Sequence, residues 1–224
     1  MVPARHTRRG AGCGVGHDVA VFVPEHYRQR DAGALFEAMH AHPFATIVST
    51  GDDGAPAASW IPFVIEGTPQ KPVIFGHLAR QNDQWRQWSA DTPLLALFQG
   101  PHHYISPAWY DSEPNVPTWN YVAVQVRGRP RLLADSVEVE AMLDRLVVAL
   151  ESAREQPWQL AAQPAAYRAQ QAGGIVGFEL IVEQITGAWK LSQRASAPDR
   201  EGAIAGLRAA GGDDALAIAR LMAG

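Results

Sequence analysis

The sequence predicts a mainly β fold, a β-barrel with peripheral helices. About six segments have the pattern of strands, they follow one another with antiparallel-type connections, and helical periodicity is confined to a few segments. Strands and helices do not alternate as parallel βαβ units would require. With 224 residues, of which 47% are hydrophobic and 19% charged, the chain can bury the core of one such domain.

The first twenty residues differ in composition from the rest of the chain. They combine glycine, arginine and histidine without apolar periodicity, and such segments rarely join a packed core. We therefore expect residues 1–20 to be a disordered N-terminal tail. Residues 21–224 are expected to form a single domain that ends in helices.

The first predicted elements are a short helix and a hairpin. Asp31 can cap a helix that runs to about residue 42. Residues 44–50 then have the pattern of a strand, followed by an Asp-Gly turn and a second strand over residues 56–65. Two prolines in this second strand lack a backbone donor, so it should lie at an edge, carry a bulge or pair on one side only.

The later strands follow in order along the chain. Residues 73–78, 94–100 and 103–106 are extended segments, and residues 121–133 alternate valine with small or polar residues. This period of two is typical of a half-buried strand. Residues 175–187 form the last predicted strand.

Two helical regions are predicted in the second half. Asp135 and Glu138 fit a capping box at the start of a helix whose apolar face extends to about Leu150. A long polar and alanine-rich connection follows it. A terminal helical region, with Asp213 as its expected cap, closes the chain.

Composition excludes several classes of protein. No apolar run approaches the roughly 20 residues that cross a bilayer, so we expect no membrane partner. The net charge of −4 lacks the basic excess of most nucleic-acid binders, so any contact with DNA would need a local patch. A lone cysteine, Cys13, and the absence of an export signal make the cytoplasm the expected location.

Catalytic and metal motifs are missing from the sequence. His102 and His103 are neighbours on an extended segment and point to opposite faces, so they cannot readily share a metal, and we expect no metal site. A Gly-x-Ser-x-Gly elbow, a Walker loop and a Gly-x-Gly-x-x-Gly loop are all absent. The catalytic residues, if there are any, are therefore unknown, and phosphate recognition would rest on side chains.

One segment, residues 76–85, is a candidate anion site. A predicted strand there leads through a turn into a helix near Asn82, which could bring His77 and Arg80 together at an anion. Arginine suits phosphate because its planar guanidinium group donates to two oxygens at once. On the alternative interpretation, Arg80 is a surface residue and Asn82 is only a helix cap.

Six of the tryptophans offer a second candidate site. Together they could line a pocket for a flat aromatic ligand, or they could equally be core residues. The six are Trp60, Trp85, Trp88, Trp109, Trp119 and Trp189.

Six longer motifs resemble one family. FVPEHY, PFATIVS, GHLARQNDQW, GPHHYISPAWY, VPTWNYVAVQVRG and WKLSQ occur in this order, and the chain is similar over residues 21–210 to the PaiB-type FMN-binding negative transcriptional regulators. The resemblance implies an FMN-binding split β-barrel, like that of the pyridoxamine-phosphate oxidases. It also implies a homodimer that holds FMN at the subunit interface.

The resemblance also implies a set of site residues. His77, Arg80 and Asn82 become the candidates for the phosphate and ribityl chain of FMN. Further candidates lie near the isoalloxazine ring or the dimer seam, and these are Trp60, Trp119 and Asn120 with the adjacent Tyr121. Lys190 could contact the phosphate or the ring of FMN from either subunit, or could simply pair with an exposed acid.

Three functional hypotheses follow. The first is a flavin-bound homodimer that represses genes, directly or through a partner. DNA binding is possible, although the sequence has no helix-turn-helix signature or basic recognition helix. The alternatives are an FMN-dependent oxidoreductase acting on a small molecule, whose hard chemistry the flavin would supply, and an interaction module that has lost its flavin.

Overall fold

The computed structural model describes residues 22–224, so the predicted tail over residues 1–20 lies outside the described residues. The strands are β1 Arg28–Gln29, β2 Phe44–Thr50, β3 Pro56–Pro62, β4 Val64–Thr68, β5 Lys71–Ala79, β6 Leu94–Ile105, β7 Thr118–Leu132 and β8 Ile175–Lys190. The α-helices are α1 Ala32–Ala41, α2 Ser136–Glu151, α3 Ala165–Gly173, α4 Ala197–Ala210 and α5 Asp213–Ala223. Short 3₁₀ helices are η1 Glu25–Tyr27, η2 Asp83–Gln87, η3 Pro107–Trp109 and η4 Leu160–Ala162.

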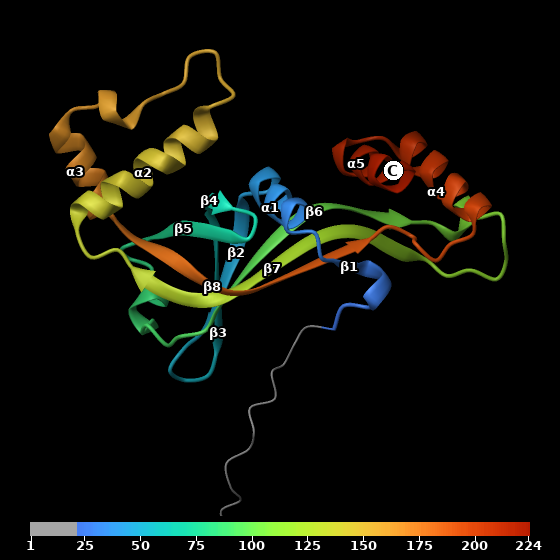
Figure 1. Cartoon of the computed structure of the whole chain (residues 1–224), viewed down its shortest axis with the longest axis horizontal. Helices are drawn as coiled ribbons and strands as arrows, with labels where there is room; N and C mark the ends of the chain where they lie inside the picture. The colour runs from blue at the N-terminus through green and yellow to red at the C-terminus, as the bar shows by residue number, and fades with distance from the viewer. Residues whose placement is uncertain (1–21) are drawn as a thin grey trace, which may run out of the picture.

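A single antiparallel sheet forms the body of the molecule. Its strand order is β3-β2-β6-β7-β8-β5-β4, with β1 paired to β8. The two end strands, β3 and β4, follow each other in the chain and are separated only by Phe63. The backbone itself therefore joins the two ends of the sheet and closes it into a barrel, as Figure 1 shows. The predicted β-barrel with peripheral helices is confirmed.

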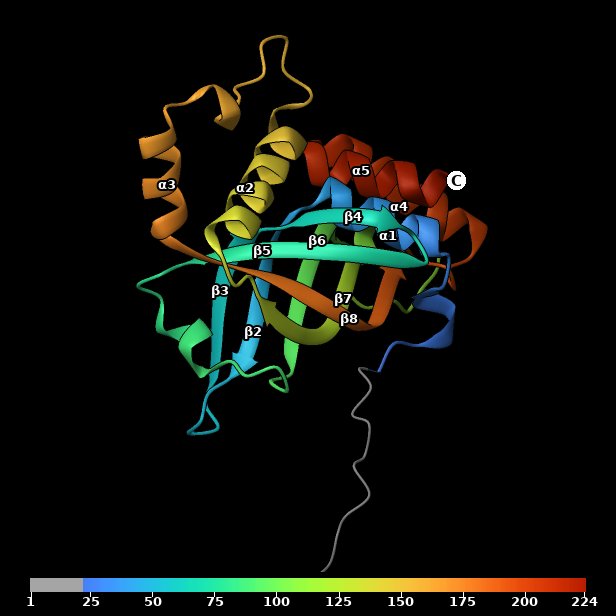
Figure 2. The ribbon, with the colours of Figure 1, turned by 60° about the vertical axis from the view of Figure 1, so that its left-hand side comes forward.

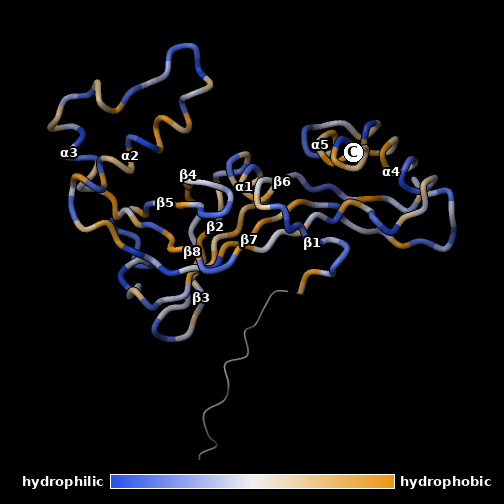
Figure 3. Tube along the Cα trace, viewed as in Figure 1, coloured by the Kyte–Doolittle hydropathy of each residue, from blue (hydrophilic) through white to orange (hydrophobic). Residues whose placement is uncertain are grey.

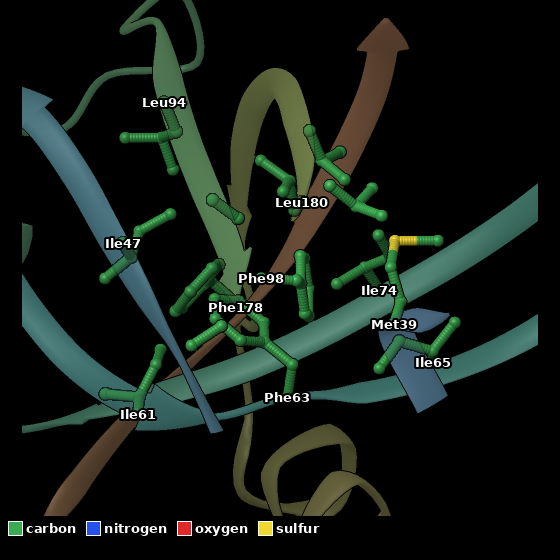
Figure 4. Packing of buried hydrophobic residues seen from close by; sticks show 14 of the residues in the cluster. Met39, Ile47, Ile61, Phe63, Ile65, Ile74, Leu94, Phe98, Phe178 and Leu180 are labelled. Atoms are coloured by element: carbon green, nitrogen blue, oxygen red, sulfur yellow. The ribbon is translucent and has the colours of Figure 1, made fainter. Parts of the chain in front are cut away.

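Buried aliphatic and aromatic side chains fill the barrel. Phe63 packs against Phe98 and Phe178, with ring centroids 5.4 and 6.2 Å apart, and α1 closes one end with Met39 (Figure 4). The hydropathy trace in Figure 3 shows the same division, with apolar segments along the strands and polar segments in the loops. Burial on this scale is the main term that stabilises the fold.

The first half of the chain has the elements that its sequence pattern predicts, with one difference. Asp31 caps α1 by accepting a hydrogen bond of 2.7 Å from the Ala34 amide. The predicted strand over residues 56–65 is divided into β3 and β4, because the chain turns at Phe63 from one end of the sheet to the other. As expected from its prolines, β3 is an edge strand that pairs with β2 alone.

In the middle of the chain, two predicted segments are one strand. Residues 94–100 and 103–105 belong to β6, which pairs with β7 and shifts register between Gln99 and His102, whereas Ser106 lies after the strand and caps η3. The shift coincides with Gly100 and Pro101, and proline lacks the backbone donor that a regular ladder needs.

The second half shows two corrections. The alanine-rich connection after α2 contains η4 and the helix α3, whose short apolar face packs on β8 and α2. Asp213 is not a cap, since α5 begins after Gly212 without a side-chain cap and Asp213 is its first residue. The Asp135 cap of α2 is confirmed by a 2.9 Å hydrogen bond from the Glu138 amide.

A set of hydrogen bonds centred on Asp199 attaches helix α4 to the loop between β6 and β7. Asp199 of α4 is 6% exposed and accepts hydrogen bonds from the Asp111 and Ser112 amides, each 2.9 Å long. Its other oxygen accepts from the hydroxyls of Ser112 and Ser196, at 2.7 and 2.8 Å. These bonds, led by the Ser112 hydroxyl, lower the pKa of Asp199 to about 2.

The helices share one side of the molecule. In Figure 1 and in the turned view of Figure 2, α1, α2, α4 and α5 all lie above the sheet. The opposite side of β3, β2, β6, β7 and the end of β8 is therefore free of α-helices among residues 22–224. None of the helices in this part of the chain is long and apolar enough to span a membrane.

Candidate functional site

The side free of helices presents one continuous surface, which we call the outer face. It consists of the side chains of β3, β2, β6, β7 and β8 that point away from the barrel core. One row across it is given by the strand register, in which Trp60 lies opposite Thr46, Thr46 opposite Leu97, Leu97 opposite Gln125, and Gln125 opposite Thr186. This row is uncharged and mixes apolar and polar groups.

A shallow hollow of about 280 Å³ lies in the middle of the outer face. This outer-face hollow is slightly smaller than the roughly 300–1,000 Å³ typical of complete ligand pockets. A surface of this kind resembles one wall of a site. The hollow is lined by Thr46, Leu97, Phe98, Gln99, His102, Tyr121, Val122, Ala123, Val124 and Gln125.

Trp60 stands beside the hollow and next to the predicted anion segment. Its side chain is 68% exposed and lies opposite Thr46, which lines the hollow. The preceding residue, Ser59, points inward and accepts a 2.9 Å hydrogen bond from Nδ2 of Asn82. The Asn82 segment is thereby attached to β3 at the position of Trp60.

Asn82 has a second role as the cap of η2. Its Oδ1 accepts a 2.9 Å hydrogen bond from the Gln84 amide. Gln84 is buried and accepts from the Ser59 hydroxyl at 2.7 Å, while its Nε2 donates to Ser49 at 3.1 Å. Every polar atom of Ser59 is used, because its hydroxyl accepts from one amide and donates to the other.

Arg80 is exposed and partly engaged. Its Nε donates to the Gly173 carbonyl at 2.6 Å and its Nη2 to the Ile175 carbonyl at 2.7 Å. A guanidinium has five N–H groups, so these two bonds fix its plane and leave other donors directed at solvent. Such a preorganised arginine suits a phosphate.

His77 lies on the outer surface of β5. Its neighbours Gly76 and Leu78 face the barrel core, so its own ring points to the opposite side, where Phe75 meets α2. Its Nδ1 is buried and has no hydrogen-bond partner within residues 22–224. Burial lowers the pKa of His77, so the ring is neutral at pH 7 and can still accept or donate one hydrogen bond.

The remaining candidates lie near the far end of β7 and β8. Trp119 is 52% exposed and its ring lies 6.1 Å from that of His102, which lines the hollow. Lys190 lies opposite Tyr121, donates to the Thr118 hydroxyl and stands 5.9 Å from the Tyr27 ring.

Asn120 is an exception within this group, because it points inward. It is fully buried, and its Nδ2 donates to the Ser192 hydroxyl at 2.9 Å and to the Met222 sulfur at 3.2 Å. These bonds fasten α5 and the turn at Ser192, a residue with a φ of 56°, to β7. The contacts of Asn120 are therefore structural in this chain.

The seven candidates thus form two groups. Trp60, Arg80 and Asn82 gather near the β3 edge, with His77 on the adjoining strand, whereas Trp119, Asn120 and Lys190 lie at the other end. Strand β8 joins the two groups. Its residue Ile175, which pairs with Ala79, and Lys190 are 15 residues apart, or roughly 50 Å measured along the strand. The outer-face hollow lies between the two groups. Their assignment to FMN stays a prediction.

Several residues at the hollow were not expected from the sequence. Thr46, Gln99 and Gln125 are ordinary polar residues on strands, and only the register places them together. The sequence places His102 on an extended segment and gives it no ligand-binding role, whereas in the structure it lines the hollow and its Nδ1 lies 3.7 Å from the Asp214 carboxylate of α5. The alternation of β2 and β7 was the signal that could have identified them.

The barrel, its closure through Phe63 and the uncovered outer face define a split β-barrel, and comparisons with known proteins agree. Solved structures with this fold include the FAD and heme binding protein from Mycobacterium smegmatis, with a TM-score of 0.58 and 16% identity, covering 84% of this chain and 81% of that one. The flavocytochrome Anf3 from Azotobacter vinelandii has a TM-score of 0.54 and 13% identity, covering 77% and 71%. At these identities the likeness shows the fold alone.

The sequence itself shows the family. Residues 21–184 match the family described as "Putative FMN-binding domain". The chain is also 33% identical over 205 residues to the protease synthase and sporulation protein PAI 2 of Bacillus subtilis, covering 90% of this chain and 96% of that protein. The chain therefore belongs to this FMN-binding family, as its motifs predicted, and its cofactor is FMN.

The residues of the outer face, together with Arg80 on the loop that follows β5, fit this cofactor. FMN combines a flat ring, a hydroxylated chain and a phosphate, and these need apolar contact, neutral hydrogen-bonding groups and a cation respectively. Leu97 and Trp60 supply the first, Gln99 and Gln125 the second, and Arg80 the third.

Proposed function

We propose that the protein acts as an FMN-bound homodimer that negatively regulates gene expression in the cytoplasm. The observation that carries the flavin-bound dimer is the outer-face hollow, a shallow uncharged wall bordered by aromatic side chains. The regulatory role is supported by the similarity to the Bacillus subtilis protein named protease synthase and sporulation protein PAI 2, of which this chain covers 96%.

Three features support the homodimer. Trp60 and Trp119 are large apolar residues that stand exposed at the two sides of the hollow, and aromatic residues are enriched in interfaces. The hollow has the size of part of a pocket. Finally, Arg80 bonds to the first residue of β8 and Lys190 is its last residue, and the two ends of β8 lie on opposite sides of the molecule in Figure 1, so one FMN could contact both only if they come from different subunits.

Charge favours regulation through a protein partner over direct reading of DNA. The net charge of the whole chain is −4, and Arg5, Arg8 and Arg9 lie before the described residues together with the single acid Asp18. The described domain is therefore more acidic than the chain as a whole. The arginines of β7 do not form a phosphate-binding stripe, because Arg129 and Arg131 each pair with two carboxylates.

One observation favours an FMN-dependent oxidoreductase as a second candidate. His102 and Tyr121 line the hollow and can exchange protons with a bound molecule. When bound, FMN supplies the electron-transfer chemistry, and these two side chains would hold or release protons beside it.

The first experiment is a visible absorbance spectrum of the purified protein, before and after addition of FMN, together with light scattering. A flavin spectrum in a particle of twice the chain mass supports the flavin-bound dimer, whereas a monomer that binds FMN contradicts the interface site. The flavin-loaded protein is then tested for NAD(P)H oxidation and for capture of DNA. Rapid oxidation of NAD(P)H by the loaded protein would favour the oxidoreductase over the regulator.

A further inference from the structure

A second hollow lies on the opposite side of the sheet, between α1 and α5. This helical groove has a volume of about 420 Å³, which falls in the usual range for a small-molecule pocket. Its floor is formed by strands β6, β7 and β8 through Pro101, Val122 and Trp189. None of the residues assigned to FMN lines it. Figure 1 shows the two helices standing above these strands.

The walls of the helical groove are made of small side chains. Ala34, Ala38 and Ala41 of α1 follow the spacing that places them on one helical face, and Ala217 and Leu221 of α5 oppose them. Small residues keep the two helices from interlocking and leave the indole of Trp189 accessible as the floor. The interior of the groove is thus apolar and suited to a flat hydrophobic body.

The rim carries opposite charges on its two sides. Glu37 is on the α1 side and Arg220 on the α5 side, and both are exposed. Within residues 22–224 neither makes an ion pair or a side-chain hydrogen bond, unlike most arginines of this part of the chain, so each is available to a ligand. An arginine with all its donors available at the mouth of an apolar groove is complementary to a carboxylate.

We propose that the helical groove binds a small aromatic monocarboxylic acid, with the ring on Trp189 and the carboxylate at Arg220. Glu37 selects against a second negative charge at the other rim. This site is separate from the flavin site, yet Val122 lines both hollows, from opposite faces of the same strand. Pro101, in the floor, lies inside the register shift that ends at His102. We therefore expect binding in the groove to change the affinity for flavin through this shared strand, an expectation that rests on the proposed flavin site.

The test uses calorimetry on the full chain with matched probes. Indole-3-propionate and 3-phenylpropionate carry the acid, and indole-3-propionamide has the same body without the charge. We expect saturable binding of the acids and at least about tenfold weaker binding of the amide, the usual effect of losing a hydrogen-bonded charge. The proposal is overturned if neither acid shows saturable binding, or if acid and amide bind equally well.

Two variants and a control locate the site. Arg220→Ala should remove the preference for the acid, and Ala217→Leu should weaken acid and amide alike by filling the groove. Arg208→Ala, which removes an exposed arginine from the last turn of α4, should bind as the original chain does. Unchanged acid binding by Arg220→Ala overturns the proposal. So does a change of oligomeric state in Ala217→Leu, because the groove would then be occupied by a second copy of the chain.

A final measurement separates this site from the flavin site. The acid titration is carried out with and without FMN, and the FMN titration with and without the acid. Coupling between two binding sites is reciprocal. FMN should therefore change the dissociation constant of the acid by the same factor as the acid changes that of FMN. If FMN does not bind while the acid does, the proposed function fails and the groove stands. If FMN binds and the acids do not, the groove fails alone.

Discussion

Asn82 and Ser59 are 23 residues apart in the sequence, yet the amide of the first donates a 2.9 Å hydrogen bond to the hydroxyl of the second. This bond sets the loop that carries Arg80 against the strand that carries Trp60. Two candidate FMN contacts of different chemistry, a cation and an aromatic ring, are thus held in a fixed relation. The buried Gln84 completes the connection from the other side.

We expect Ser59→Ala to weaken both folding and FMN binding. The change leaves polar atoms of Asn82 and Gln84 without their partner, a loss that usually costs about 1–3 kcal/mol of unfolding free energy. Urea unfolding and an FMN titration measure the two effects. Ser136→Ala, at the exposed start of α2, is the matched control. A variant as stable as the original chain would show that this bond does not hold the loop.

Arg80→Ala should weaken FMN binding by about 1.5–3 kcal/mol, because it removes a charged donor to phosphate. The dissociation constant is measured by quenching of flavin fluorescence. The nearby Arg86→Ala serves as control, since Arg86 is occupied by an ion pair of 3.0 Å with Asp83. Because Arg80 also bonds to carbonyls at the start of β8, a melting curve must show that the variant is folded. A folded Arg80→Ala protein with unchanged FMN affinity would remove Arg80 from the site.

Trp60→Glu should convert the protein to a monomer. It places a charge on the outer face beside the hollow, where an interface would bury it without a partner, and such burial costs far more than the lost contact. Light scattering reports the mass of the particle. Trp158→Glu, which changes an exposed tryptophan beside α2, should leave the mass unaltered. A Trp60→Glu dimer would mean that subunits meet on another surface.

The pH dependence of stability should include a contribution from Asp199. Its pKa is lowered from 3.8 to about 2 in the folded chain, so the ionised carboxylate stabilises the fold. The contribution is complete above about pH 4 and is lost as the pH falls toward 2. Asp199→Asn should therefore be less stable than the original chain at pH 7, by an amount that shrinks in acid. Urea unfolding at pH 7, 4 and 3 measures this, and a constant difference would contradict it.

Much of the fold could be predicted from the sequence because the signals were local. The cap at Asp31, the alternation of β7 and the prolines of β3 each act within a few residues. The turn at Phe63 could not be predicted, because a break between two strands of similar composition depends on which end of the sheet each one joins. The helix α3 was missed because its stability comes from contacts with α2 and β8 more than from its own alanine-rich sequence.

The candidate site was less predictable for a related reason. The residues from His77 to Asn82 are contiguous, so a motif could reveal them. Thr46 and Gln125 come together only through the register of separate strands. Nothing in the sequence indicated that Asn120 faces inward or that Lys190 stands far from Arg80. Side-chain direction and strand length, which no motif encodes, decide both points.

The closure at Phe63 also affects how the protein avoids aggregation. The two outermost strands of the sheet, β3 and β4, carry the unpaired backbone groups through which sheets of different molecules could join. Both strands are short, they are tied to each other by one residue, and Pro56 and Pro62 remove donors from β3. Valine at these two positions would restore backbone N–H donors along this exposed edge. The prolines therefore protect β3 against fibre-like assembly, and Pro62 does so next to the residue at which the barrel closes.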